Sequence, residues 1–342
     1  MSTSVAYTAG AAGAESLIDP AVLARIGDLE LVARVVVEGA VSGLHRSPHL
    51  GSSMDFAEHR AYMPGDDIRR IDWKLFARSD RHFVKEFEAD TNTNLRVLLD
   101  VSPSMRYGGE ARPDETRRGV QGRSSISKLD YARYLAASLA YLASTQRDRV
   151  GLVTFDQDIV EYVPPSARHL SLVLHTLDGL GRRPAGGGQG ERATSTPPSS
   201  ASLGPHSLRP TFQRIGESIQ RRSLVLVISD LYEEPRDVLE ALAFLRGRGN
   251  DLIVFHVLDP RELEFPFSEA ANFVDVESGE RLPVIPEYLR AQYRALIAAH
   301  TAELARLLGE SRIDYTLFDT SRPLDHALHS YLATRERLQR VR

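Results

Sequence analysis

Two apolar runs in this chain each lead into an aspartate, and this repeated pattern constrains the fold more than any other feature. Leu95–Leu99 is followed directly by Asp100, and Leu224–Ile228 is followed, after one serine, by Asp230. Short apolar runs bounded by polar residues are typical of strands that are buried on both faces of a parallel sheet. The sequence therefore predicts a sheet that delivers carboxylates to the edge where its strands end.

The pattern of the remaining chain supports an α/β fold. Beyond residue 94, apolar runs alternate with helical periods, which is typical of βαβ units around a mostly parallel sheet. Ser127 and Asp130 form a capping box that predicts the start of a helix. Ile159–Val163 is predicted as an edge strand and Phe273–Leu282 as a hairpin. We expect a doubly wound, mostly parallel sheet flanked by helices.

Composition changes along the chain predict three regions. Residues 1–18 are rich in small residues and are expected to form a disordered tail, and residues 19–93 form an N-terminal helical and charged accessory segment. Residues 94–342 form the α/β domain. Within this domain, residues 181–210 are rich in Gly, Pro, Ser and Thr, which predicts a flexible loop.

Composition and charge exclude several classes of protein. The 342 residues are 42% hydrophobic and 26% charged, which is ordinary for a soluble globular protein. The net charge of -4 argues against nucleic-acid binding, which calls for a basic surface. The chain has no cysteine, so disulfides and thiolate zinc sites are excluded. Neither a membrane span nor a signal peptide is expected, and we predict a cytoplasmic protein.

The residues around the two strand ends have the chemistry of a divalent metal site. Mg²⁺ and Mn²⁺ take oxygen ligands, and Asp100, Ser102, Ser104 and Asp230 all offer them. Open α/β sheets bind ligands beyond the carboxyl ends of their strands, at the point where the strand order reverses. If the two strands are neighbours there, their side chains can share one Mg²⁺ or Mn²⁺ ion. The alternative is an ordinary turn whose hydroxyls satisfy helix amides.

Several spaced motifs connect the chain with a known family. These are Arg60–Tyr62, Pro64–Trp73, Ala77–Arg78, Asp100–Met105, Ser127–Asp130 and Asp148–Leu152. With them, the chain from Ser42 to the C-terminus resembles the family called domain of unknown function 58. That family is similar to von Willebrand factor type A domains, which carry a metal-ion-dependent adhesion site. Many members have membrane helices near the N-terminus, and this chain departs from them in that respect.

The resemblance also implies a further metal ligand. Type A sites usually add a threonine from a loop, and the corresponding loop here is residues 181–210. By spacing and by the Leu-Gly pair that follows it, Ser202 is the best candidate, whereas Thr194 or Thr196 fits better by residue type. Ser200 is a fourth candidate.

The resemblance implies a non-catalytic interaction module. Its metal site would bind an acidic group of a partner protein, and the chain would act as an adaptor with a MoxR-type AAA+ ATPase in the assembly or maturation of an unknown client. Two alternatives stay open. One is a metal-dependent phosphatase-like hydrolase with Asp100 as nucleophile, although such sites want a second aspartate where Ser102 stands. The other is a metal-free scaffold.

Overall fold

The structure of the protein is a computed structural model. It describes residues 28–44, 93–108, 126–182, 208–277, 279–325, 328, 329, 331, 332 and 334, together with residues 23, 59–61, 76, 78, 81 and 83–85. Among these residues, no helix combines the length and apolarity that a membrane crossing requires.

A six-stranded sheet forms the centre of the molecule, in the order β10-β7-β6-β3-β4-β5. Its strands are β3 (Asn94–Asp100), β4 (Arg149–Phe155), β5 (Ile159–Ser166), β6 (Leu224–Ser229), β7 (Asp251–Leu258) and β10 (Asp314–Asp319). All neighbours are parallel except β5, which pairs antiparallel with β4 at the sheet edge. The strands β4 and β5, which follow β3 in the chain, lie on one side of β3, and β6 lies on its other side. The reversal of strand order therefore falls between β3 and β6.

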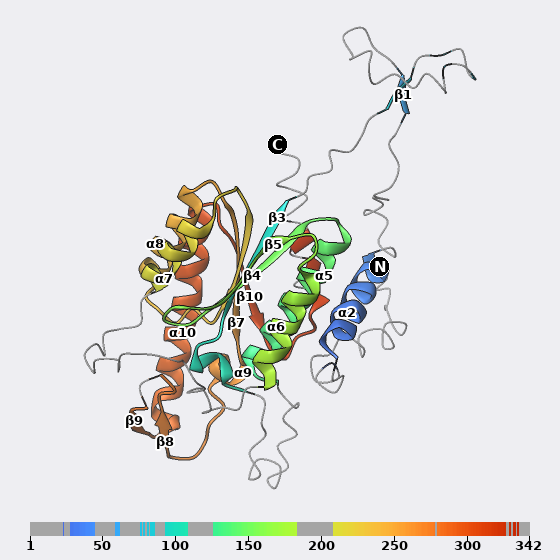
Figure 1. Cartoon of the computed structure of the whole chain (residues 1–342). Coiled ribbons are helices and arrows are strands. Elements are labelled where there is room, and N and C mark those ends of the chain that lie inside the picture. Colours follow the sequence, from blue (N-terminus) through green and yellow to red (C-terminus); the bar gives the residue numbers. More distant parts are fainter. Residues whose placement is uncertain are drawn as a thin grey trace, which may run out of the picture. The chain divides into compact units, whose positions relative to one another are not determined.

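Helices cover both faces of this sheet (Figure 1). One face carries α2 (Leu29–Leu44), α5 (Lys128–Thr145) and α6 (Leu170–Arg182). The other carries α7 (Leu208–Ser218), α8 (Pro235–Gly247) and the long α10 (Pro286–Glu310). Two short helices, η3 (Pro103–Arg106) and α9 (Pro260–Glu264), follow β3 and β7, and a separate hairpin is formed by β8 (Ala271–Val274) and β9 (Arg281–Val284).

The central strands alternate their side chains between two hydrophobic cores. In β3, Leu95, Val97 and Leu99 join the core beneath α5, whereas Leu98 joins the core beneath α7 and α8. In β6, Val225 and Val227 likewise lie on the α7 and α8 side, while the residues between them face the other way. Because successive side chains of a strand point to opposite faces, a strand covered on both faces is mostly apolar. This explains the apolar runs of the sequence. Arg96 of β3 is a buried exception, and its guanidinium donates to the hydroxyl groups of Ser223 and Tyr162.

The predicted fold class is confirmed, including the edge strand and the hairpin. Of the predicted capping box, the structure shows the half that Ser127 provides. The side chain of Ser127 accepts a hydrogen bond from the Asp130 backbone N–H at the start of α5. Helix α9 was not predicted, because five residues are too few to show a helical period.

The N-terminal boundary differs from the one the sequence predicts. Residues 42–92 form one compact unit, which includes the antiparallel pair of β1 (His59–Ala61) and β2 (Phe83–Lys85). The other unit contains residues 1–41 and 93–342. Helix α2 belongs to this larger unit because its apolar face, including Val32 and Val36, is buried in the same core as α5. The predicted tail of residues 1–18 and most of the loop 181–210 lie outside the described residues.

We expect Phe212→Ala to destabilise the larger unit. The Phe212 ring is fully buried on α7 and meets Phe155 of β4 edge-on, with ring centroids 5.2 Å apart. Removing a buried phenylalanine leaves a cavity, which costs about 3–5 kcal/mol. Urea unfolding should show this loss. Leu172→Ala on α6, where the side chain is 48% exposed, is the matched control and should change the free energy of unfolding by less than about 0.5 kcal/mol.

Candidate functional site

The parallel pairing of β3 with β6 brings the two predicted aspartates to one edge of the sheet. Leu99 lies opposite Ile228 in this pairing, so Asp100 and Asp230 emerge at nearly the same level. Both carboxylates are buried, with exposed fractions of 5% and 4%. A shared site requires that the two strands be neighbours, and the structure meets this condition.

Hydrogen bonds hold the Asp100 carboxylate from two sides. Its Oδ1 accepts from the backbone N–H of Ser102 at 2.9 Å, and its Oδ2 accepts from the Ser229 hydroxyl at 2.5 Å. The first contact is local to the turn that leaves β3, whereas the second comes from the last residue of β6. The carboxylate is thus fixed in orientation by both strands of the central pair.

The two serines that follow Asp100 are hydrogen-bonded to each other, at a distance that also suits adjacent metal ligands. The Ser102 and Ser104 hydroxyl oxygens lie 3.0 Å apart, because the short helix η3 turns Ser104 back toward Ser102. Two ligands at right angles around an octahedral Mg²⁺, each about 2.1 Å from it, are separated by about 3.0 Å. With the neighbouring Asp100 they form an oxygen-only donor set, which fits a hard cation such as Mg²⁺ or Mn²⁺.

Asp230 is positioned by a strained turn. The next residue, Leu231, is fully buried and has a positive φ of 43°, a conformation that costs a non-glycine residue roughly 1–2 kcal/mol. The turn is held by two hydrogen bonds: the Leu231 N–H donates to the Ser229 hydroxyl, and the Leu231 carbonyl accepts from His300 Nε2 on α10. Strained backbone of this kind is concentrated at functional sites, where the surroundings enforce it.

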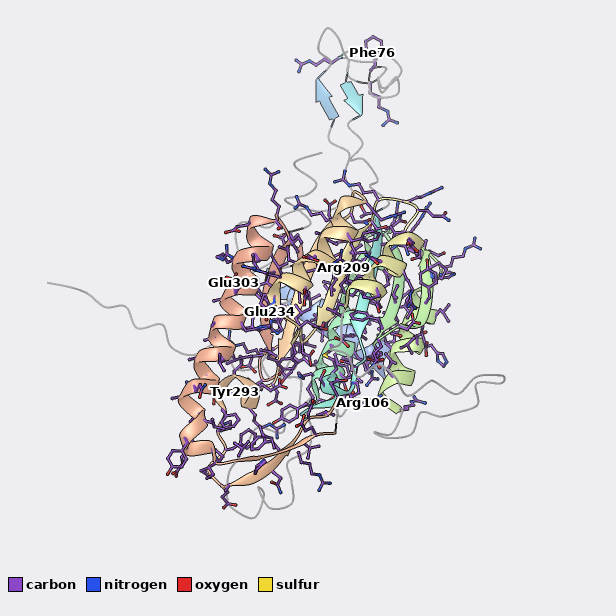
Figure 2. The ribbon with its side chains drawn as sticks, turned by 90° about the vertical axis from the view of Figure 1, so that its left-hand side faces the viewer. Phe76, Arg106, Arg209, Glu234, Tyr293 and Glu303 are labelled. Atoms are coloured by element: carbon purple, nitrogen blue, oxygen red, sulfur yellow. The ribbon has the colours of Figure 1, made fainter. Side chains whose placement is uncertain are left out.

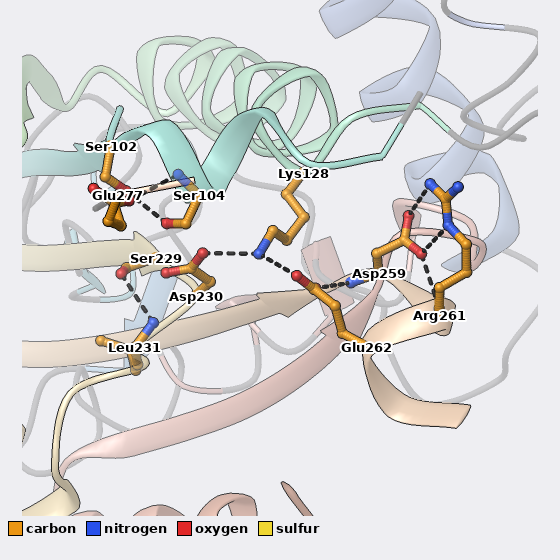
Figure 3. A network of polar contacts seen from close by, with 10 residues as sticks. All are labelled: Ser102, Ser104, Lys128, Ser229, Asp230, Leu231, Asp259, Arg261, Glu262 and Glu277. Atoms are coloured by element: carbon orange, nitrogen blue, oxygen red, sulfur yellow. Dashed lines mark hydrogen bonds and ion pairs between the residues drawn. The ribbon is translucent and has the colours of Figure 1, made fainter. Parts of the chain in front are cut away.

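A buried lysine is paired with Asp230. Lys128 is completely buried at the first position of α5, and its Nζ lies 2.8 Å from Asp230 Oδ2 and 2.8 Å from Glu262 Oε1 (Figure 3). Burial opposes the charge of Lys128, but the two carboxylates outweigh it and raise the pKa of the ammonium group. The ring of Tyr232 lies over the same ammonium, with its centroid 4.8 Å away.

The sequence analysis did not assign a role in the site to Lys128. A signal was present: a lysine in the first turn of a helix is unfavourable, because the helix dipole places partial positive charge there. A positive residue at such a position indicates a non-local carboxylate partner. Lys128 contacts carboxylates 102 and 134 residues further along the chain.

The polar network continues from Glu262 into α9. Asp259 and Glu262 form a capping box, in which Glu262 Oε2 accepts from the Asp259 N–H at 2.8 Å. The Asp259 carboxylate also accepts from the Arg261 side chain at 3.0 Å. This chain of contacts runs from Asp230 through Lys128 to the start of α9 (Figure 3). It ties the end of β6 to the end of β7.

Two glutamates that the sequence analysis missed also approach the site. Glu277 lies between β8 and β9, and its Oε1 accepts from the backbone N–H of Ser104 at 2.9 Å (Figure 3). Glu233 lies three residues beyond Asp230, in the same loop. An acidic residue so close to Asp230 was visible in the sequence, whereas no sequence pattern connects Glu277 with a serine 173 residues away.

The gathering of acidic groups changes their protonation. Burial, and then the charge of Asp230, raise the pKa of Asp100 to about 7, against the lowering effect of its hydrogen bonds to Ser229 and Ser102. Burial likewise raises the pKa of Glu233 to about 7, with further contributions from Asp100, Asp230 and Glu277. The site therefore favours a proton, or another positive charge, near neutral pH.

The structure does not reach every predicted ligand. Ser202, Thr194, Thr196 and Ser200 all lie outside the described residues. Within the part of the chain that the structure describes, no three His, Asp or Glu side chains are grouped so that they could hold a metal ion. A metal site here would depend on the serine hydroxyls together with Asp100, and its assignment stays a prediction.

The sequence is similar to a family and to proteins without an assigned role. The family model described as "Protein of unknown function DUF58" matches residues 58–303. Uncharacterized proteins of Mycobacterium bovis and Mycobacterium tuberculosis are each 26% identical to this chain over 297 residues. These alignments cover 85% of this chain and 82% of each relative.

Two solved structures from Bacteroides are similar to this one, each at 17% identity and a TM-score of 0.41. The first is an aerotolerance-related membrane protein from Bacteroides fragilis, with 69% of this chain and 96% of that chain covered. The second is the conserved hypothetical protein BatB from Bacteroides thetaiotaomicron, with 71% of this chain and 98% of that chain covered.

The raised pKa values of Asp100 and Glu233 predict a pH-dependent stability. Both groups bind protons more tightly in the folded protein than their ordinary pKa values of 3.8 and 4.5 allow. In the metal-free protein, the contribution of these two groups to the free energy of unfolding should therefore fall as pH rises from about 4 to about 7. The fall is at most about 1.4 kcal/mol per pH unit for each group. Urea unfolding in EDTA at several pH values measures this. The free energy of unfolding of the Asp100→Asn, Glu233→Gln double variant should depend less on pH over this range. An unchanged pH dependence would contradict the raised pKa values of Asp100 and Glu233.

Removing the buried lysine should be costly. Lys128→Met leaves Asp230 and Glu262 buried without their cation, and breaking a buried ion pair costs about 3–5 kcal/mol. Adding Asp230→Asn and Glu262→Gln to Lys128→Met should recover part of the loss, because the uncompensated charges disappear. Chemical denaturation of the single and triple variants tests this; equal stabilities would show that the pairing contributes little.

Proposed function

The chain belongs to the DUF58 family, whose function is unknown, and we propose a function from the site. We propose that the protein is a non-catalytic interaction module, which binds an acidic group of a partner protein through a divalent cation. Asp100, Ser102 and Ser104 would hold a Mg²⁺ or Mn²⁺ ion. Asp230 and a hydroxyl of the loop 181–210, with Ser202 as the first candidate, would complete the set. The parallel sheet provides the edge at which Asp100 and Asp230 lie.

The observation that carries this proposal is the spacing of the two serines beside a fixed carboxylate. The 3.0 Å between the Ser102 and Ser104 oxygens suits adjacent ligands of an octahedral ion, and Asp100 is oriented by hydrogen bonds from both central strands. This arrangement contributes oxygen ligands with a single negative charge. A divalent ion bound there would keep net positive charge and attract a carboxylate from outside.

The partner and the setting follow from the family resemblance. We propose that the chain works in the cytoplasm with a MoxR-type AAA+ ATPase, as an adaptor in the assembly or maturation of a client protein. An adaptor needs reversible binding rather than chemistry, and a carboxylate bound to a metal through one open position meets that need.

A metal-free scaffold is the second candidate, and Lys128 is the observation that favours it. Its ammonium already supplies positive charge to Asp230 at 2.8 Å, so the end of β6 does not depend on a metal ion for charge balance. A phosphatase-like hydrolase with Asp100 as nucleophile has less support, because the position of its general acid is taken by Ser102. Phosphate release that depends on Asp100 would favour the hydrolase.

Calorimetric titration with Mn²⁺ tests the metal site. Asp100→Asn removes the charge but keeps one carbonyl oxygen that can accept from the Ser102 N–H, while its amide NH₂ can donate to the Ser229 hydroxyl, so the fold should persist. We expect it to weaken Mn²⁺ binding by roughly tenfold or more, which corresponds to about 1.4 kcal/mol. Asp156→Asn is the matched control, because Asp156 directly follows the end of β4, the strand that pairs with β3 beside Asp100. Equal Mn²⁺ affinities in all three proteins would support the scaffold instead.

The same variants separate the interaction hypotheses. Capture of a MoxR-type ATPase by the wild-type chain should be lost in EDTA and in Asp100→Asn, and retained in Asp156→Asn. Capture that is indifferent to both EDTA and Asp100→Asn would contradict a metal-bridged interaction.

A further inference from the structure

The hairpin of β8 and β9 carries a carboxylate into the candidate metal site. Glu277 lies in the turn between the two strands, and its backbone N–H donates to Asp275 Oδ1 at 2.9 Å. Gly279 closes the turn with a hydrogen bond from its N–H to the Asp275 carbonyl, and its positive φ of 73° suits a residue without a side chain. The turn is thus organised locally by Asp275 and presents Glu277 at its tip.

Aromatic packing anchors the hairpin, although its strands are largely exposed. Phe273 of β8 stacks on Phe265 with ring centroids 5.6 Å apart, and Phe265 also contacts Tyr293 of α10. Figure 2 shows Tyr293 at the end of α10 nearest the hairpin. By contrast, Val274 is 52% exposed and Leu282 60% exposed. The hairpin is therefore an exposed arm that aromatic packing holds at Phe273, one strand pair away from the turn.

At its tip, the arm meets the site through Glu277. Its Oε1 lies 2.9 Å from the backbone nitrogen of Ser104, the residue whose hydroxyl we assign as a metal ligand. A backbone N–H beside a cation is a suitable donor for a carboxylate that approaches the same ion, because it holds one oxygen and orients the group. A partner's carboxylate would need the same donor and the same side of the site.

From this geometry we infer that Glu277 is a tethered internal ligand, which occupies the position of the partner's acidic group until the partner displaces it. The inference rests on the proposed metal site and adds its regulation. A tethered group competes at an effective concentration set by its tether, in the millimolar range for short flexible links. Weak and non-specific carboxylates would be excluded, and a partner would need further contacts to compete.

Terbium luminescence can test this, with Tb³⁺ as a probe for a hard-cation site. Lifetimes in H₂O and D₂O give the number of water molecules on the bound ion. We expect Glu277→Gln to add about one water and to weaken Tb³⁺ binding roughly three- to tenfold. Acetate should then remove water from the ion in Glu277→Gln but not in the wild type. Glu280→Gln is the matched control, since Glu280 lies on the same hairpin three residues away and should behave as the wild type.

The outcomes distinguish this inference from the function on which it rests. If Tb³⁺ binding in the wild type depends on Asp100, but Glu277→Gln leaves the water number and the acetate response unchanged, Glu277 is not a ligand and only this inference fails. If Asp100→Asn binds Tb³⁺ as the wild type does, the metal site and the internal ligand fail together. A purely structural role of the contact with Ser104 would alter the exchange of the Ser104 amide without altering the water number.

Discussion

The parallel pairing of β3 with β6 is the interaction on which the rest of the structure depends. Each strand is mostly apolar because both faces of the sheet are covered, and each ends at a polar turn. Their pairing in register makes these turns neighbours, so that Asp100 and Asp230 face the same region. The Ser229 hydroxyl then bonds directly to Asp100, which links the two strand ends through their side chains.

Bringing carboxylates together in a buried place creates an electrostatic cost that positive charge must offset. On one side of the site Lys128 supplies that charge, between Asp230 and Glu262. On the other side Asp100 faces hydroxyl groups, and it carries a raised pKa. Asp230 is thus paired with a cation of the protein itself, whereas Asp100 is held by a hydroxyl and a backbone N–H.

The segments that follow β7 give this site its particular character. Helix α9 supplies Glu262 to the buried lysine, and the hairpin of β8 and β9 supplies Glu277 to Ser104. Both arise from the chain between β7 and α10, a part of the molecule outside the alternating strands and helices of the sheet. The parallel sheet provides the edge, and this connection determines which groups surround it.

The sequence by itself determined the strands, most helices and the residues at the two strand ends, because burial on both faces and helix capping leave local patterns. The strand order was not among them: the sequence made the pairing of β3 with β6 a condition of a shared site, and the structure meets that condition. Only the tertiary structure decided the partners of Lys128 and Glu277. Those contacts span 102 to 173 residues. They depend on how side chains pack across elements, which no periodicity in the chain records.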